Sequence, residues 1–345
     1  MAFAVTAVNP PRARLGFYAD FVAYVLGDRR LAAILPISLT AKAWVRPPVT
    51  LEDKKTVAMT RRFATALLLF FFTGPLQAEI SATFEQASQS ILSNPHDLKL
   101  SPDGRYLFVA DVGNNRIAIL DPETLTMVGT FGEDHQSGTH DIDFDATGQA
   151  YVASTHNNRV IVYTLNGKDA TPVNELTTRI RGPEGVLAHP NGRVYVAGAW
   201  SNNVVVFENA VMVDELGGLS APHDIELAAN GSDIWVADAG NDRILLLSED
   251  LMIKRELSRE SYGFDGVRYM DLLDDHSLVA ADKNNHQIKF IAADGKLSLV
   301  LGDGRPGRGP GKFRTPEGVE VRGTDLWLSD SGNDRVVRYR LTPAP

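Results

Sequence analysis

The stretch Val236-Ala-Asp-Ala-Gly-Asn-Asp-Arg-Ile244 returns near the end of the chain as Leu328-Ser-Asp-Ser-Gly-Asn-Asp-Arg-Val336. In both copies a short apolar strand ends in Asp, an Asn-containing turn follows, and a β-branched strand begins after Arg. Asn and Gly tolerate the positive φ that tight hairpins require. The unit is therefore predicted to be a β-hairpin, and its recurrence indicates a repeat protein.

The same unit occurs six times from residue 94 onward. Each copy opens with a short motif, whose first residues are Pro95, Thr139, Pro183, Pro222, Phe264 and Pro316. Successive motifs are 44, 44, 39, 42 and 52 residues apart. Four short strands in about 44 residues are typical of a propeller blade. We therefore predict an all-β fold, a six-bladed β-propeller with four-stranded antiparallel blades, over residues 94–345.

The sixth repeat ends at Pro345 after only three strands, so its blade needs one more. Residues 79–93 contain an alternating strand candidate. We predict that this N-terminal strand closes the ring by pairing with the last blade, because pairing removes an exposed edge.

Residues 59–78 have the layout of a secretory signal peptide: two arginines, an apolar run, a Gly-Pro break and a small residue, Ala78. The uncharged span, residues 63–78, is shorter than the about 20 residues of a membrane-spanning helix, so we expect cleavage and no stable membrane span. Residues 1–58 are interpreted as a non-native or disordered extension upstream of Met59. The mature protein is expected in the periplasm or outside the cell.

The charge distribution argues against nucleic acid as a partner. Residues 1–78 hold ten of the 34 basic and four of the 43 acidic residues, which leaves a formal charge of −15 for the remainder. Such a body repels a phosphate backbone. The chain has no Cys, which excludes disulfides, thiolate metal sites and cysteine nucleophiles.

The repeats resemble those of NHL-repeat six-bladed β-propellers, with YVTN-like character in the first and third blades. The resemblance rests on the two stretches quoted above and covers the chain from residue 94. It implies a propeller fold but not a function, since propellers include enzymes, ligand binders and interaction modules. We expect the protein to be a monomer.

The second residue of each repeat motif is expected to line the central channel, where the six equivalent positions face one another. These residues are His96, His140, Glu184, His223, Asp265 and Glu317. All six are imidazoles or carboxylates, which are metal ligands. The histidines favour Zn²⁺ or another transition metal, with Ca²⁺ as a second choice, whereas turn and capping roles would explain the same residues without a ligand.

The histidine positions also resemble those of peptidyl-hydroxyglycine amidating lyases, which are NHL propellers with zinc held by three channel histidines. The matching residues would be His96, His140 and His223. They fall in the first, second and fourth repeats rather than in alternate ones, which departs from a symmetric triangle.

Two further features are candidates for ligand contact. The glycine-rich segment before the sixth motif carries Arg305, Arg308 and Lys312, which would bind a substrate carboxylate or phosphate if they reach over the channel mouth. The alternative is a loop that packs between blades. Trp200, on the rim of the third hairpin, would stack on a ligand, although lone exposed aromatic residues usually have no such role.

The aspartates Asp111, Asp238, Asp282 and Asp330, with nearby arginines, recur in most repeats. An ion pair that is present in most blades has a structural role more often than a catalytic one. We therefore predict that these aspartates and arginines fix the hairpins.

Two functions follow from these observations. In one, the protein is an exported metal-dependent lyase or hydrolase that acts on a small molecule or peptide at the channel mouth. In the other, it is a non-catalytic module that binds another protein or a component of the cell envelope.

Overall fold

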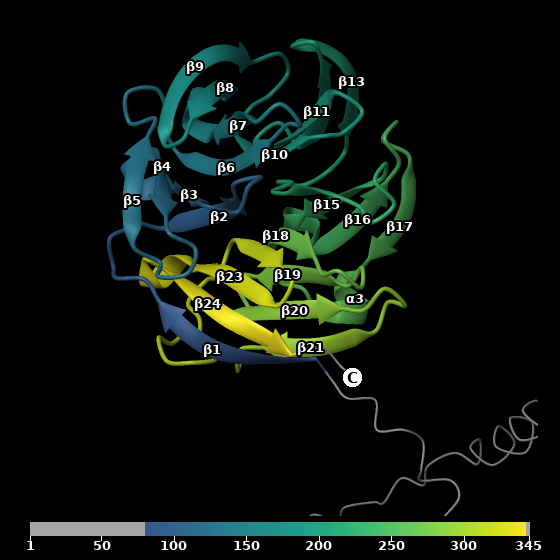
Figure 1. Cartoon of the computed structure of the whole chain (residues 1–345). Helices are drawn as coiled ribbons and strands as arrows, with labels where there is room; N and C mark the ends of the chain where they lie inside the picture. The colour runs from purple at the N-terminus through teal and green to yellow at the C-terminus, as the bar shows by residue number, and fades with distance from the viewer. Residues whose placement is uncertain (1–79, 343–345) are drawn as a thin grey trace, which may run out of the picture. The chain divides into compact units, whose positions relative to one another are not determined.

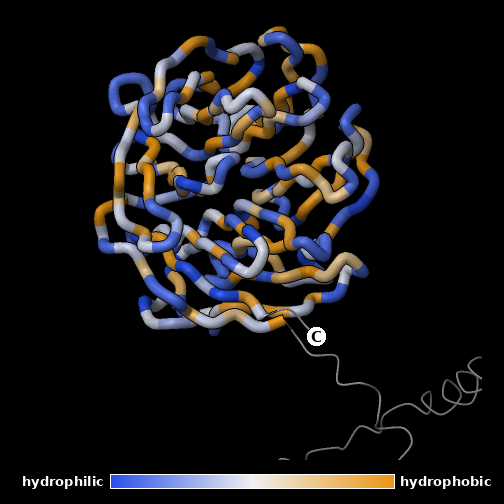
Figure 2. The backbone as a smooth tube through the Cα atoms, viewed as in Figure 1, coloured by the Kyte–Doolittle hydropathy of each residue, from blue (hydrophilic) through white to orange (hydrophobic). Residues whose placement is uncertain are grey.

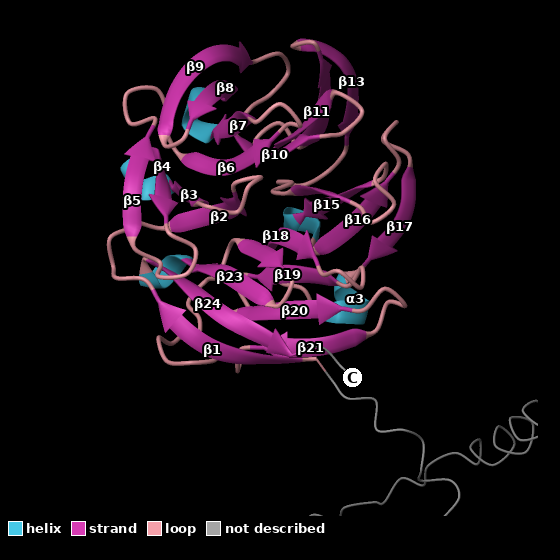
Figure 3. Ribbon diagram, viewed as in Figure 1, coloured by secondary structure: helices cyan, strands magenta, loops and turns pink. Residues whose placement is uncertain are grey.

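The computed structural model describes residues 80–342, and the predicted signal peptide and N-terminal extension lie outside them. The described part consists almost wholly of β-strands in six four-stranded antiparallel sheets (Figures 1 and 3). Within residues 80–342 no helix is both long and apolar enough to cross a membrane.

The first three blades are continuous in sequence, with the innermost strand first. Blade 1 consists of β2 (Pro95–Leu100), β3 (Leu107–Asp111), β4 (Arg116–Leu120) and β5 (Met127–Phe131). Blade 2 consists of β6 (Thr139–Phe144), β7 (Gln149–Ser154), β8 (Arg159–Asn166) and β9 (Asp169–Leu176). Blade 3 consists of β10 (Pro183–Ala188), β11 (Arg193–Gly198), β12 (Asn203–Glu208) and β13 (Val211–Gly217).

Blades 4 and 5 follow the same plan, and blade 6 borrows a strand. Blade 4 consists of β14 (Ile225–Leu227), β15 (Ile234–Asp238), β16 (Arg243–Leu247) and β17 (Ile253–Leu257). The short helix α3 (Arg259–Tyr262) leads to blade 5, which consists of β18 (Val267–Leu272), β19 (Leu278–Asp282), β20 (Gln287–Ile291) and β21 (Leu297–Leu301). Blade 6 consists of β22 (Val319–Arg322), β23 (Asp325–Asp330), β24 (Arg335–Thr342) and β1 (Ser81–Ala87).

The ring closes as the sequence predicts. Strand β1 pairs antiparallel with β24 at the outer edge of blade 6, where Figure 1 shows the two strands side by side. The innermost strands contact one another in the order β2, β6, β10, β14, β18, β22 and back to β2. The fold is therefore a six-bladed β-propeller whose last blade joins both ends of the described chain.

The hydrophobic core is divided into clusters, one at each contact between neighbouring blades. Figure 2 shows the corresponding pattern, with hydrophobic stretches in every blade separated by hydrophilic turns. Because each blade buries its faces only against its two neighbours, the fold depends on every blade having both.

A left-handed residue ends each hairpin between the second and third strands. Its φ lies between 52° and 56° in all six blades, at Asn115, Asn158, Asn202, Asp242, His286 and Asp334. The side chain of each also accepts a hydrogen bond from a backbone N–H of the next blade. The Asn-rich turns of the sequence thus shape the hairpins and also link the blades.

The recurrent aspartates have the predicted structural role. The carboxylate of Asp238, which is fully buried, accepts hydrogen bonds from the Ser220 N–H (2.7 Å), Asn241 Nδ2 (2.8 Å) and Arg243 Nε (2.7 Å). Asp111 and Asp330 make the same three contacts in their blades. These residues fix each hairpin to the segment that enters its blade.

We expect Asp238→Ala to lower the free energy of unfolding by about 3 kcal/mol, because it leaves buried donors and an arginine without their acceptor. The matched control is Asp250→Ala, which removes a carboxylate that is 74% exposed and lies 3.4 Å from Arg193. That change should cost less than about 1 kcal/mol. Urea denaturation of both variants checks the difference, and equal losses would contradict the structural role.

Candidate functional site

The channel end of each innermost strand is fixed by a hydrogen bond that recurs in every blade. The channel position is the residue of each blade that faces the central axis. Three residues before it, a backbone N–H donates to the side chain of a residue at the end of the second strand or just after it. The donors are Ser93, Ser137, Arg181, Ser220, Asp265 and Arg314. Counting three residues on from each gives the channel position in the same register for all blades.

This register places Arg268, and not Asp265, at the channel position of blade 5. The N–H of Asp265 bonds to the Asp282 carboxylate at 2.8 Å, as that of Ser93 bonds to Asp111. Asp265 itself is half-buried and accepts a hydrogen bond from Asn284 Nδ2 at 2.9 Å. The six channel residues, which we call the mouth ring, are His96, His140, Glu184, His223, Arg268 and Glu317.

One half of the mouth ring is a cluster of two imidazoles and a carboxylate. His223 Nε2 lies 2.5 Å from Glu184 Oε2, and His140 Nε2 lies 4.0 Å from Glu184 Oε1. The Nδ1 atoms of the two histidines face backbone carbonyls, of Ala221 at 2.8 Å and of Gly138 at 2.9 Å. With Nδ1 facing a carbonyl, Nε2 is the ring atom directed at Glu184 in both histidines.

The other half is built around Glu317, which is completely buried. Its carboxylate contacts Lys283 Nζ, Arg268 Nε (3.2 Å) and His96 Nε2 (3.8 Å). Lys283 comes from the hairpin that follows β19 and reaches the ring from outside it. The two cations balance Glu317 and carry one positive charge in excess of it.

The two halves meet edge to edge. The rings of His96 and His140 have centroids 4.4 Å apart and planes at 84°. Arg268 Nη1 lies 3.4 Å from His223 Nδ1, so the two halves are also neighbours at this point. Imidazoles, carboxylates and cations thus form one connected polar cluster.

Tyr269 crosses the channel next to the mouth ring. Its hydroxyl donates to the backbone carbonyls of Glu184 (2.8 Å) and His140 (3.1 Å), so the phenol extends from blade 5 to blades 2 and 3. The side chain is almost fully buried, and burial raises the pKa of Tyr269 well above its ordinary value. Tyr269 therefore bridges the inner strands of blades 2, 3 and 5 next to the mouth ring.

Deeper in the channel a second set of charged groups holds the blades together. Asp141, Asp224, Asp271 and Glu320 each accept a hydrogen bond from a backbone N–H of the next blade. Lys99 Nζ lies among the carboxylates, 2.9 Å from Glu226 Oε2. The small space here, ≈ 10 Å³, is about the room that one water needs.

Burial and charge give the mouth ring unusual protonation. Burial lowers the pKa of His96 to about 3 against the opposing charge of Glu317, so the ring is neutral at pH 7. Burial acts to raise the pKa of Glu184, but the contacts with His223, followed by the charges of His140 and His96, outweigh it and hold the pKa at about 2. Burial also acts to raise the pKa of Glu317. The charges of His96, Lys283 and Arg268 outweigh burial and hold this pKa at about 2.

Several polar atoms of the mouth ring are buried without a well-aligned hydrogen bond. They are His96 Nδ1, Glu184 Oε2, Arg268 Nε and both carboxylate oxygens of Glu317. The contacts of Glu184 and Glu317 are close in distance but poorly directed. Unsatisfied buried polar groups are rare in folded proteins and concentrate where a ligand, ion or water binds.

The donor set of the mouth ring fits a transition metal in chemistry. Two imidazoles whose Nδ1 atoms face backbone carbonyls, together with a carboxylate, are a ligand combination of catalytic zinc sites. As the side chains lie, however, no group of three His, Asp or Glu residues within residues 80–342 is arranged to hold a metal ion. Binding a metal would require Glu184 and His223 to separate.

Residues 74–300 match the family described as "Lactonase, 7-bladed beta-propeller". The chain belongs to this family. No curated protein sequence matches it. This member of the lactonase family has six blades in its described part, and the NHL-repeat resemblance is confirmed as far as the β-propeller architecture.

Solved structures with the same fold include both lyases and binding proteins. A catalytically inactive virginiamycin B lyase from Staphylococcus aureus with quinupristin has 16% identity and a TM-score of 0.54, over 77% of this chain and 89% of that chain. An auxiliary nutrient binding protein from Bacteroides thetaiotaomicron has 14% identity and a TM-score of 0.62, over 77% of this chain and 78% of that chain. These likenesses show the fold alone.

In this lactonase-family propeller the glycine-rich segment packs against blade 6 and is not joined to the mouth ring. Arg308 donates to the Asn333 carbonyl at 3.2 Å and to Ser90 Oγ at 2.5 Å. Lys312 Nζ pairs with Asp303 at 2.7 Å inside the segment, and Arg305 is exposed. The segment thus has the packing role that the sequence left as the alternative.

Trp200 lies on the rim of the face that carries the mouth ring. It is 48% exposed and stacks on His156, with ring centroids 5.8 Å apart and planes at 19°. The neighbour of His156 in its hairpin, Thr155, contacts His140 Nδ1 at 2.7 Å. The Trp200–His156 pair is therefore an aromatic surface one residue removed from the ring.

Sequence reasoning missed Arg268, Lys283 and Tyr269. The signal for Arg268 was available as a spacing: in the other five blades the channel residue precedes the last residue of the second strand by 13 to 15 positions. Arg268 precedes Asp282 by 14 positions and Asp265 precedes it by 17. Lys283 and Tyr269 do not recur among the repeats, so nothing in the repeat pattern marks them.

The neutral state of His96 predicts a pH dependence of stability. In the unfolded chain His96 takes up a proton below its ordinary pKa of 6.5. In the folded protein the pKa of His96 is about 3, so the side chain stays neutral down to about pH 3. The contribution of His96 to the free energy of unfolding is therefore at its maximum above pH 6.5. It falls by about 1.4 kcal/mol for each pH unit below that value. Between about pH 6.5 and 4.5 wild type should therefore lose about 2 to 3 kcal/mol relative to His96→Gln.

The measurement is urea denaturation of both proteins at several pH values. The raised pKa values of Asp141 (about 7) and Asp143 (about 6), due mainly to burial, affect both proteins alike. They cancel in the difference between the two curves. Parallel curves for wild type and His96→Gln would show that His96 is not held neutral.

Proposed function

We propose that this lactonase-family propeller binds a small carbonyl-containing molecule in the mouth ring and cleaves an ester-type bond in it, as a hydrolase or lyase. The observation that carries the proposal is the buried contact of 2.5 Å between His223 Nε2 and Glu184 Oε2 beside two cations. The family name supports a lactone as the first substrate to test.

The geometry supplies the groups that such a reaction needs. When a ligand separates His223 Nε2 from Glu184, that nitrogen would take a proton from the attacking water or from the carbon next to a carbonyl, and return it to the leaving oxygen. The Glu184 carboxylate would stabilise the imidazolium formed in between. Arg268 and Lys283 lie where they can balance a developing negative charge, with Glu317 limiting their excess charge. Tyr269, buried and bonded across the channel to the Glu184 carbonyl, would limit the access of bulk water to these groups from within the channel.

A screen of lactones, simple esters, hydroxyglycine peptides and sugar acids tests this proposal. For a compound that wild type converts, His223→Gln should lower kcat/KM at least about a hundredfold, the effect typical of losing a general base. The matched control, Lys312→Gln, removes a charge from the glycine-rich segment and should leave kcat/KM unchanged. Equal rates in wild type and His223→Gln would overturn the assignment of the base.

A divalent metal is a separate part of the proposal. His140 and His223 would bind it through Nε2, with Glu184 as a further ligand, and Zn²⁺ or another transition metal suits these donors better than Ca²⁺. When bound, it would lower the pKa of a coordinated water and polarise a carbonyl. Elemental analysis should find a stoichiometric metal that is lost in His140→Ala and His223→Ala. Metal-free protein with full activity would refute this part alone.

Export is also proposed, from the signal-like residues 59–78. N-terminal sequencing of the protein from its host should begin at Glu79. A chain that begins at Met1 would contradict both the export signal and the interpretation of residues 1–58.

The second candidate function is binding without catalysis. The exposed Trp200–His156 stack beside the mouth ring favours it, because such a surface would contact a protein or a sugar that covers the mouth ring. A compound that binds in the screen without conversion, and whose affinity falls in Trp200→Ala, would support this function over the enzyme.

A further inference from the structure

A pocket of ≈ 230 Å³ lies between blades 4 and 5, at the opposite end of the strands from the mouth ring. Its loops are the turns that join β14 to β15, β18 to β19, and β20 to β21. The hairpins near the mouth ring join the second and third strands instead, so the two sites open on different faces. None of the pocket residues belongs to the mouth ring.

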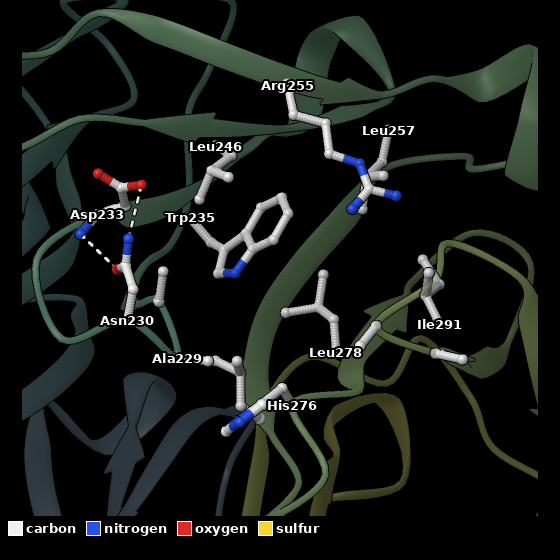
Figure 4. A pocket seen from close by; sticks show the side chains of 14 residues that line it. Ala229, Asn230, Asp233, Trp235, Leu246, Arg255, Leu257, His276, Leu278 and Ile291 are labelled. Carbon is white, nitrogen blue, oxygen red and sulfur yellow. Dashed lines mark hydrogen bonds between the residues drawn. The ribbon is translucent and has the colours of Figure 1, made fainter.

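The walls of the pocket are mostly apolar and come from both blades, and Asn230, Asp233, which is paired with Lys254, and His276 are its polar residues besides Arg255. Figure 4 shows the indole of Trp235 between Leu246 and the residues of blade 5. The remaining apolar walls are Leu257, Leu272, Leu278 and Ile291. A pocket of this composition takes a ligand with an apolar body and a few polar contacts.

The indole N–H of Trp235 is an unpaired donor in this wall. Trp235 is only 9% exposed, and within residues 80–342 its Nε1 has no hydrogen-bond acceptor, whereas Trp327, at the equivalent place in blade 6, donates to the Pro122 carbonyl at 2.8 Å. In Figure 4 the ring nitrogen of Trp235 faces the side of the pocket with Ala229 and His276. This N–H is open to the pocket, so it is free to donate to an acceptor on a bound ligand.

Arg255 is a cation without a counter-charge at the same pocket. Its neighbours on β17 are both paired, Lys254 with Asp233 and Glu256 with Arg243. Arg255 makes no ion pair with any residue in the described part of the chain, and Figure 4 shows it extending from β17 toward the pocket. A guanidinium over an apolar pocket suits a carboxylate.

We propose that this pocket binds a small carboxylate with an aromatic or short aliphatic body. The apolar body packs against Trp235 and the leucines, the carboxylate pairs with Arg255, and an oxygen of the ligand accepts the Trp235 N–H. A 150 Å³ cavity accommodates benzene, so ≈ 230 Å³ has room for one ring and a carboxymethyl group. The site is independent of the proposed function of the mouth ring.

Isothermal titration of the full chain with phenylacetate tests the proposal, with phenylacetamide as the uncharged probe of the same shape. Wild type should bind phenylacetate at least about tenfold more tightly than phenylacetamide. Arg255→Gln should remove that preference by weakening phenylacetate alone. Lys296→Gln makes the same change in net charge at an exposed turn nearby, outside the pocket, and should change neither affinity.

Two further variants test the location. Ala229→Phe adds a ring at an exposed position on the pocket wall and should abolish binding of both probes while the chain still folds. Trp235→Phe removes the N–H together with part of the apolar wall, and should weaken both probes, phenylacetate more than phenylacetamide. Absence of saturable binding to wild type, or affinity unchanged in Ala229→Phe, would overturn the proposal. Conversion of a mouth-ring substrate should be the same in Arg255→Gln and wild type, so the two sites can fail separately.

Discussion

We expect the chain to unfold or aggregate when residues 79–93 are deleted. The deletion removes β1, whose pairing with β24 runs from Ser81–Thr342 to Ala87–Val337. It also removes Ile80, Ala82, Phe84 and Ala87 from the hydrophobic cluster between blades 5 and 6. The unpaired edge of β24 would then be free to pair with another molecule.

Size-exclusion chromatography and circular dichroism of the deletion variant measure this effect. A single substitution in β1 tests packing without shortening the chain. The ring of Phe84 lies 5.6 Å from that of Tyr339. Phe84→Ala should lower the free energy of unfolding by about 2 to 3 kcal/mol. The adjacent Thr83 is exposed, and Thr83→Ala should cost less than about 0.5 kcal/mol. A monomeric deletion variant with an unchanged Tm would contradict the role of β1 in closing the ring.

The second large effect is expected at Glu317. Glu317→Gln removes the negative charge between Arg268 and Lys283 in a fully buried position, and leaves two cations without their counter-charge. Breaking a buried ion pair by removing one partner costs about 3 to 5 kcal/mol. The control, Glu256→Gln, removes a carboxylate that is 44% exposed and should cost less than about 1 kcal/mol.

Urea denaturation measures both losses, and a double variant identifies their cause. Glu317→Gln combined with Lys283→Met removes a cation together with the carboxylate, so it should recover part of the stability lost by Glu317→Gln alone. A double variant no more stable than the single one would show that the loss is not caused by uncompensated charge.

The sequence predicts the fold because the repeats are local. Blade number, hairpin residues such as Asn115, and the borrowed strand β1 all follow from spacing and strand pattern, which do not depend on contacts between blades. The recurrent aspartates could be assigned for the same reason, since Asp238 and Arg243 belong to one hairpin.

The site is harder to predict because its contacts cross between blades. Five of the six mouth-ring residues follow from the repeat register, but Phe264-Asp265-Gly266-Val267 imitates the opening motif three residues too early, which hides Arg268. Lys283 enters the ring from a hairpin, and Tyr269 crosses the channel to backbone carbonyls. The charges of Arg305 and Lys312 suggest a channel role, but Lys312 pairs with Asp303 inside the segment and Arg308 bonds the segment to Asn333 of blade 6.

The central claim is that the mouth ring is where the protein binds its ligand. A crystal structure with a compound that binds or is converted in the screen tests it most directly. The compound is expected next to Tyr269, with polar atoms within hydrogen-bond distance of His223 Nε2 or Glu184 and of Arg268 or Lys283. A compound bound elsewhere, with the side chains of the mouth ring unchanged and uncontacted, would contradict it.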